Sequence, residues 1–147
     1  MSSNGSGDSI QQLSWLITGL VERVPHARSA LLLSADGLVR AHTEDLAKDD
    51  ADHMAAIASG LWSLAAGVGR KFADSDTVRQ VNVELEGALL FVAAAGFGTC
   101  ISVLTTDEAD PGLIGFEMAQ LVRSMQAHLE TAPRTGQAQL TATGPKV

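Results

Sequence analysis

Apolar residues that recur every three or four positions predict three helices. In the first, this spacing runs from Leu13 to Val24, and Pro25 ends it. Acidic residues at the start of the second suit the positive end of a helix dipole. The expected helices are about 9–24, capped by Asp8 or Ser9, about 48–73, and the segment that opens with Asp110 as N-cap and Pro111 as first helical residue.

Strands are predicted where apolar and polar residues alternate between turn residues. Ala35-Asp36-Gly37 is a hairpin turn sequence, and Glu86-Gly87 and Gly96-Phe97-Gly98 turn the chain again. The apolar run 88–95 predicts a central strand that is buried on both faces. The other expected strands are 28–34, 38–43, 77–85 and 99–105.

The element order, α-β-β-α-β-β-β-α, predicts an α/β (α+β) domain. Short turns between strands imply antiparallel neighbours, and three amphipathic helices need a sheet to cover. We therefore expect a five-stranded antiparallel sheet with the long helix on one face and the two terminal helices on the other. The domain should span 9–132, between a disordered leader (1–8) and a disordered tail (133–147), because both ends have few apolar residues.

The long helix has two contrasting sides. Its larger apolar residues predict a core stripe made of Met54, Ile57, Ala58, Leu61, Leu64, Ala65, Val68 and Phe72. The other side carries small side chains, and the glycines at 60 and 67 each destabilise the helix by ~1 kcal/mol relative to alanine. Small side chains allow a second backbone to approach closely, although an alanine-rich helix that simply faces water has the same composition.

We expect a contact with a second copy of the chain through this small side. The strand 77–85 alternates as an edge strand does, and two such edges could pair across a twofold axis. The predicted dimer interface is Ala56, Ser59, Gly60, Ser63, Gly67 and Arg70 of the helix, with Val81 and Val83 of the strand.

Composition limits the kinds of molecule that the chain is expected to bind and the compartment in which it is expected to work. The 147 residues carry a net charge of -7 and scattered basic residues, so nucleic acid is a poor ligand. A single cysteine, Cys100, excludes an internal disulfide and a cysteine-based zinc site, which suits a reducing compartment. No signal peptide is recognisable, and the longest apolar run, 88–98, is too short to cross a bilayer as a helix. We expect a cytoplasmic protein with no direct membrane insertion.

No set of residues forms a complete catalytic or cofactor-binding motif. The histidines lack metal-motif spacing, and the acids at 49, 50 and 52 are explained by the helix dipole better than by a cation site. The glycines at 67–69 and 96–98 lack a complete phosphate-loop pattern, and Ser29 and Ser34 lack triad partners. Trp15 and Trp62 are expected to be packing residues. The sequence predicts no catalytic residue, no metal and no cofactor, and thus no enzyme.

Several segments together resemble the roadblock (dynein light chain roadblock type) domain family, and in particular its actinobacterial, conservon-type members. They are LSWL at 13–16, ALLLSADGLV at 30–39, AAIASGL at 55–61, GALLFV at 87–92 and GFEMA at 115–119. The resemblance covers about residues 10–131. It implies a profilin-like fold and a homodimer built through the long helix and the third strand.

The resemblance also implies a noncatalytic role as regulator or scaffold of a Ras-like small GTPase, linked to a histidine-kinase-like sensor. Bacterial members of the family bind their GTPase as a dimer and reposition its own catalytic groups. Arg70, Lys71 and Arg79 are candidate partner contacts, or ordinary surface charge. Two alternatives stay open: an adaptor that ignores the nucleotide state, and a small-molecule sensor, which needs a cavity.

Overall fold

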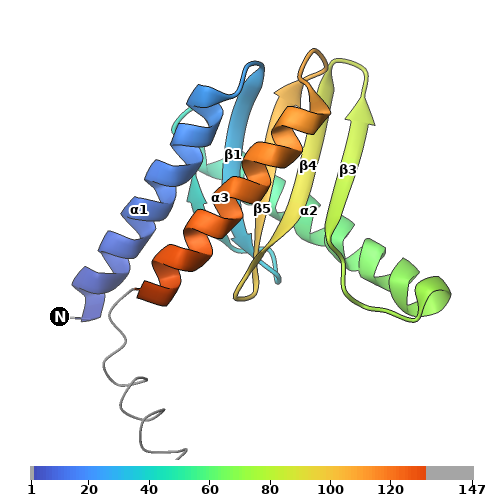
Figure 1. The fold of residues 1–147 in the computed structure, drawn as a ribbon, viewed down its shortest axis with the longest axis horizontal. Coiled ribbons are helices and arrows are strands. Elements are labelled where there is room, and N and C mark those ends of the chain that lie inside the picture. The colour runs from blue at the N-terminus through green and yellow to red at the C-terminus, as the bar shows by residue number, and fades with distance from the viewer. Residues whose placement is uncertain (1, 132–147) are drawn as a thin grey trace, which may run out of the picture.

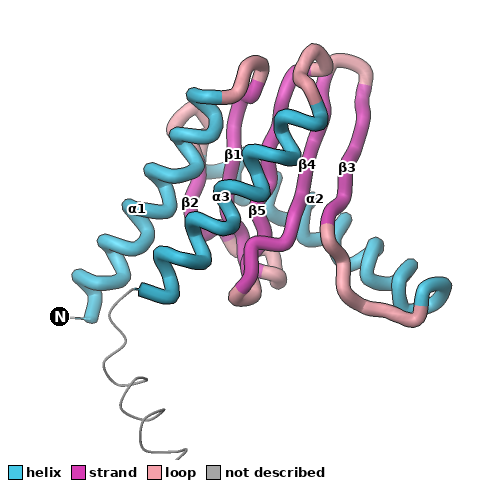
Figure 2. The backbone as a smooth tube through the Cα atoms, viewed as in Figure 1, coloured by secondary structure: helices cyan, strands magenta, loops and turns pink. Residues whose placement is uncertain are grey.

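The computed structural model describes residues 2–131 and contains a single sheet flanked by helices (Figures 1 and 2). The predicted tail, 133–147, lies outside the described residues. In chain order the elements are α1 (Ser2–Arg23), β1 (Ala27–Ser34), β2 (Val39–His42), α2 (Lys48–Val68), the π-helical turn η1 (Gly69–Ala73), β3 (Gln80–Leu85), β4 (Ala88–Gly96), β5 (Thr99–Thr106) and α3 (Pro111–Thr131).

The sheet has five antiparallel strands, as the sequence predicts, and the structure gives their order as β2-β1-β5-β4-β3. The hairpins β1–β2 and β3–β4–β5 are joined by the pairing of β1 with β5, in which Leu32 lies opposite Ile101. β2 and β3 are therefore the two edges of the sheet. The expected central strand, β4, lies between β3 and β5.

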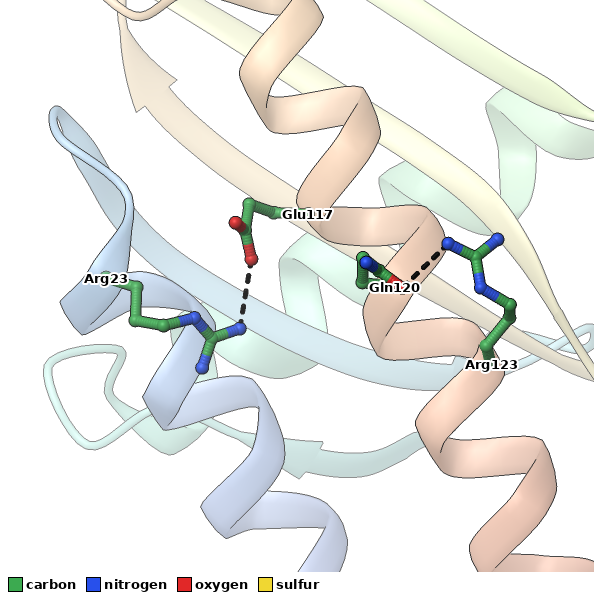
Figure 3. A network of polar contacts seen from close by, with 4 residues as sticks. All are labelled: Arg23, Glu117, Gln120 and Arg123. Atoms are coloured by element: carbon green, nitrogen blue, oxygen red, sulfur yellow. Dashed lines mark hydrogen bonds and ion pairs between the residues drawn. The ribbon is translucent and has the colours of Figure 1, made fainter.

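The helices cover opposite faces of the sheet, as predicted (Figure 1). α1 and α3 lie on one face, where an ion pair between Arg23 and Glu117 joins them at 3.1 Å (Figure 3). Ile17, Ile114 and Phe91 belong to the hydrophobic cluster on this side. α2 crosses the other face, where Ala58, Leu33 and Val92 belong to a second cluster. Each face of the sheet thus has its own core.

Local sequence signals explain several element boundaries. The Asp110 carboxylate accepts a hydrogen bond of 2.9 Å from the Gly112 N–H, which confirms it as the N-cap of α3. Gly37 and Gly87 have φ angles of 90° and 93°, a region that favours glycine, at two of the predicted turns. α2 continues into η1 and ends at Asp74, which is left-handed with a φ of 53°. The predicted helix end near Ala73 is confirmed.

The start of α1 differs from the expectation. The helix begins at Ser2, so the expected N-cap residues Asp8 and Ser9 lie inside it, and most of the expected leader is helical. A helix that is held further along the chain can extend backward, because each added residue gains one backbone hydrogen bond. Leu13 and Leu16 pack against the core cluster on this face of the sheet.

Trp15 was expected to pack inside the protein, and this prediction is wrong. Its side chain lies on α1 and is 74% exposed, whereas Ile17 and Leu20 are the fully buried residues of that helix. Trp62 packs, partly buried, against the α2-side cluster, as expected. The difference arises because residues 15 and 17 point to different sides of one helix, and only one of these sides meets the sheet.

Candidate self-association surface

The sheet-facing side of α2 is made of small residues. Ala51, Ala55 and Ala58 are completely buried, and Met54, Leu61 and Trp62 pack beside them. Alanine lets the helix lie close to the sheet, and it is also the best helix former. The expected core stripe is therefore only partly correct: Met54, Ala58 and Leu61 face the core, and several larger residues do not.

Four large apolar side chains of the expected core stripe instead face outward. Ile57 is 44% exposed, Leu64 71%, Val68 58% and Phe72 77%. We call these four residues the outer stripe. The end of α2 and η1 extend past the edge strand β3 in Figure 1, so no strand lies under this part of the stripe. Assigning these residues to the core is thus wrong, because the sheet contacts the alanine side of α2 instead.

Gly60 and Gly67 lie next to the outer stripe on the same exposed side of α2. Residues three or four positions apart share one side of a helix, so Ile57, Gly60, Leu64 and Gly67 form a continuous row. A Cβ atom added to Gly60 would meet nothing within 4 Å, and one added to Gly67 would meet only the Arg70 guanidinium, at 3.9 Å. Packing within one copy therefore does not require either glycine. A row in which large side chains alternate with glycines has gaps into which the side chains of a second helix can pack.

Ala56 and Ser63 are three or four positions from Gly60 and so adjoin the same row, and Arg70 follows on η1. The Ser59 hydroxyl donates a hydrogen bond of 2.9 Å to the Ala35 carbonyl in the β1–β2 turn, so it is used within the chain. Ala56, Ser63 and Arg70 are exposed. The outer stripe was not predicted from the sequence, and the signal that could have revealed it is the row of alanines at 51, 55 and 58.

The second part of the predicted interface is the strand β3. It is an edge strand, as expected, and it pairs with β4 alone. Val81 and Val83 are half-buried and pack against the α2-side cluster, while Leu85 is exposed at the end of the strand. The structure therefore brings Val81 and Val83 to the same face of the sheet as α2. Both parts of the expected interface therefore belong to the α2 face of the sheet, and only the strand part lies at the β3 edge.

The three predicted partner-contact cations are exposed, but they do not form one group. Arg70 and Lys71 lie on η1, where the Lys71 ammonium is 5.6 Å from the centre of the Phe72 ring. Arg79 precedes β3 and lines a groove on the opposite face of the sheet. The structure therefore joins two of these residues to the outer stripe and separates the third.

Three further features of the described residues concern metal binding, the cysteine thiol and membrane-spanning helices. No group of three or more histidine, cysteine, aspartate or glutamate residues within them could hold a metal ion. Burial raises the pKa of the Cys100 thiol above its ordinary value, so the thiol is protonated near neutral pH. Within the same part of the chain, no helix combines the length and apolar character needed to cross a membrane.

Comparisons with a family model and with solved structures point to the same family. A family model described as Roadblock/LC7 domain matches residues 13–105. The crystal structure of a Roadblock/LC7 domain from Streptomyces avermitilis is 55% identical, with a TM-score of 0.76, and the match covers 80% of this chain and 98% of that one. A search of curated proteins gives no match.

Two further solved structures extend the comparison. Another Roadblock/LC7 domain from Streptomyces avermitilis is 38% identical, with a TM-score of 0.64, over 77% of this chain and 97% of that one. MglB of Myxococcus xanthus is only 12% identical but has a TM-score of 0.75 over 86% of this chain and 93% of that one, so it shares the fold. Because the family model spans more than half of the chain, this protein belongs to the Roadblock/LC7 domain family.

Proposed function

We propose that this Roadblock/LC7 domain is a cytoplasmic, noncatalytic homodimer that regulates or scaffolds a Ras-like small GTPase. The outer stripe carries the proposal, because exposed apolar rows on a soluble domain mark association surfaces. The family resemblance supplies the class of partner. A histidine-kinase-like sensor is proposed as a further component of the same signalling system.

In the proposed dimer, a twofold axis places two α2 helices side by side. Leu64 of one copy then lies over Gly60 of the other, and the contact is repeated by symmetry. Full burial of one large apolar side chain is worth roughly 1.5–3 kcal/mol, so the exposed fractions of the outer stripe give about 10 kcal/mol for two copies. Association costs about 4–15 kcal/mol, so the gain from the outer stripe lies within the range of this cost, and pairing of the two β3 edges would add to it.

Regulation by such a dimer needs no catalytic residue of its own. Hydrolysis of GTP depends on how the groups of the GTPase are positioned around the phosphates, and a bound protein can change that arrangement. Arg70 and Lys71 are the proposed contacts, because they are exposed on η1 at the end of the outer stripe. Arg79 remains a proposed contact on the other face of the sheet.

Binding to a Ras-like GTPase from the same genome tests the proposal. The purified chain is titrated into the GTPase loaded with GDP or with a nonhydrolysable GTP analogue, and complex formation is followed by calorimetry. We expect a complex that prefers one nucleotide state and is weakened by Arg70→Glu with Lys71→Glu. Arg40→Glu, an exposed change on β2, is the matched control.

The alternatives give different results in the same assay. A complex of equal affinity in both nucleotide states indicates the adaptor that ignores the nucleotide. Absence of a complex in both states contradicts the proposed partner. A complex that persists in the double variant contradicts the assignment of Arg70 and Lys71.

A further inference from the structure

A groove lies between α3 and β3, on the face of the sheet that α2 does not cover. Its volume is about 320 Å³. Figure 1 shows α3 crossing β5 and β4, with β3 beyond it. The floor and the helical wall consist mainly of apolar and small residues: Phe91, Ala93, Gly115, Met118, Ala119 and Val122. We call this the α3–β3 groove.

Alternation along the edge strand explains why the groove is open. Val81 and Val83 point to the α2 side, so Gln80 and Asn82 point to the α3 side, where Asn82 lies opposite Phe91 of β4. On α3, Gly115 and Ala119 are one turn apart and carry almost no side chain. A Cβ atom added to Gly115 would meet nothing within 4 Å. The groove is therefore bordered by small side chains on one wall and by polar ones on the other.

The charged residues that line the groove are both arginines, although the chain as a whole is acidic. Arg79 and Arg123 line it, and no aspartate or glutamate does. The Arg123 guanidinium donates a hydrogen bond of 2.7 Å to Gln120 Oε1 and points away from the Arg23–Glu117 pair (Figure 3). Within the described part of the chain, neither Arg79 nor Arg123 forms an ion pair with a carboxylate. Two unpaired cations thus lie beside an apolar floor.

We propose that the α3–β3 groove binds an acidic, amphipathic segment of a partner protein. Carboxylates of that segment would pair with Arg79 and Arg123, and its apolar side chains would cover Phe91 and Val122. The chain's own last residues do not have this chemistry, because 133–147 contain Arg134 and Lys146 and no acid. Because the groove and the outer stripe lie on opposite faces of the sheet, this site goes beyond the proposed dimer and does not require it, although Arg79 is also one of the proposed partner contacts.

The test uses the full chain and synthetic peptides in fluorescence anisotropy. The probe is a labelled peptide in which glutamate is interspersed with leucine, and its matched controls have lysine for glutamate or serine for leucine. We expect saturable binding of the first peptide only. Arg79→Glu with Arg123→Glu should weaken it about tenfold or more, since charge reversal replaces two attractions by repulsions. Arg40→Glu, on the opposite edge of the sheet, should leave it unchanged.

A steric variant separates the groove from general electrostatic attraction. Ala119→Trp fills the groove from an exposed position and should abolish binding while circular dichroism stays unchanged. Equal binding of the serine-containing peptide would reduce the site to an anion site and overturn the proposal. Absence of binding by the glutamate–leucine peptide, or binding that persists in Ala119→Trp or in the double arginine variant, would also overturn it.

Discussion

Replacing Leu64 by alanine removes a large side chain from the middle of the outer stripe without touching either core. The side chain is 71% exposed in one copy, so the fold of a single domain gains little from it. Surface substitutions of this kind change the free energy of unfolding by less than ~0.5 kcal/mol. If the outer stripe is buried between two copies, the same change must weaken their association.

The magnitude follows from exposure and symmetry. Leu64→Ala deletes about three methylene equivalents at about 0.8 kcal/mol each, so the exposed 71% of the side chain corresponds to about 1.7 kcal/mol. A twofold contact contains this side chain twice, so the dimer loses about 3.4 kcal/mol. At about 1.4 kcal/mol for each factor of ten, the dissociation constant rises roughly 300-fold.

Sedimentation velocity over a dilution series measures this shift. Trp15→Ala is the matched control, because Trp15 is 74% exposed but lies on α1, on the other face of the sheet. We expect the Leu64 variant to dissociate at far higher concentration than the wild type, and the Trp15 variant to behave as the wild type. A wild-type chain that is monomeric throughout, or equal effects of the two variants, would refute the argument.

Three other substitutions give independent tests. Gly60→Trp fills space that is empty in one copy, so light scattering should show a monomer. The free energy of unfolding of that monomer in urea should change by less than ~0.5 kcal/mol. A dimer as stable as that of the wild type would exclude close contact between the helices. Asp110→Ala removes the N-cap of α3 and should lower the free energy of unfolding by ~1 kcal/mol in urea titrations, and no change would show that the cap is unimportant. Burial raises the pKa of the Cys100 thiol, so as pH rises above 9.0 the unfolded chain loses this proton before the folded chain does, and the free energy of unfolding falls. In urea titrations at alkaline pH, the free energy of unfolding of Cys100→Ala should fall less steeply with pH than that of the wild type. Parallel curves for the two proteins would contradict this assignment.

The strands were predictable because their signals are local. Turn sequences such as Ala35-Asp36-Gly37 fix where the chain reverses, and the alternation between turns fixes which residues face each side. The short links then fix the antiparallel pairing of β1 with β2 and of β4 with β3 and β5. The pairing of β1 with β5 depends on closing the sheet around both hairpins, and no local signal in the sequence specifies it.

The orientation of α2 was less predictable, because apolar spacing does not show which side of a helix meets the sheet. Leu64 and Val68 have the spacing of core residues, yet the sheet contacts the alanines on another side of the helix. The α3–β3 groove was also hidden from the sequence. Arg79 and Arg123 are far apart in the chain, and only the fold brings them to one groove.

The alanine face of α2 has a consequence for how such domains diversify. Ala51, Ala55 and Ala58 secure the helix to its own sheet, while Ile57 and Leu64 remain outside that contact. In the proposed dimer, mutation of Ile57 or Leu64 would therefore change which second chain a domain binds, with little effect on the stability of a single copy. A duplicated gene that diverged at these positions alone would then encode a chain that pairs with a different partner.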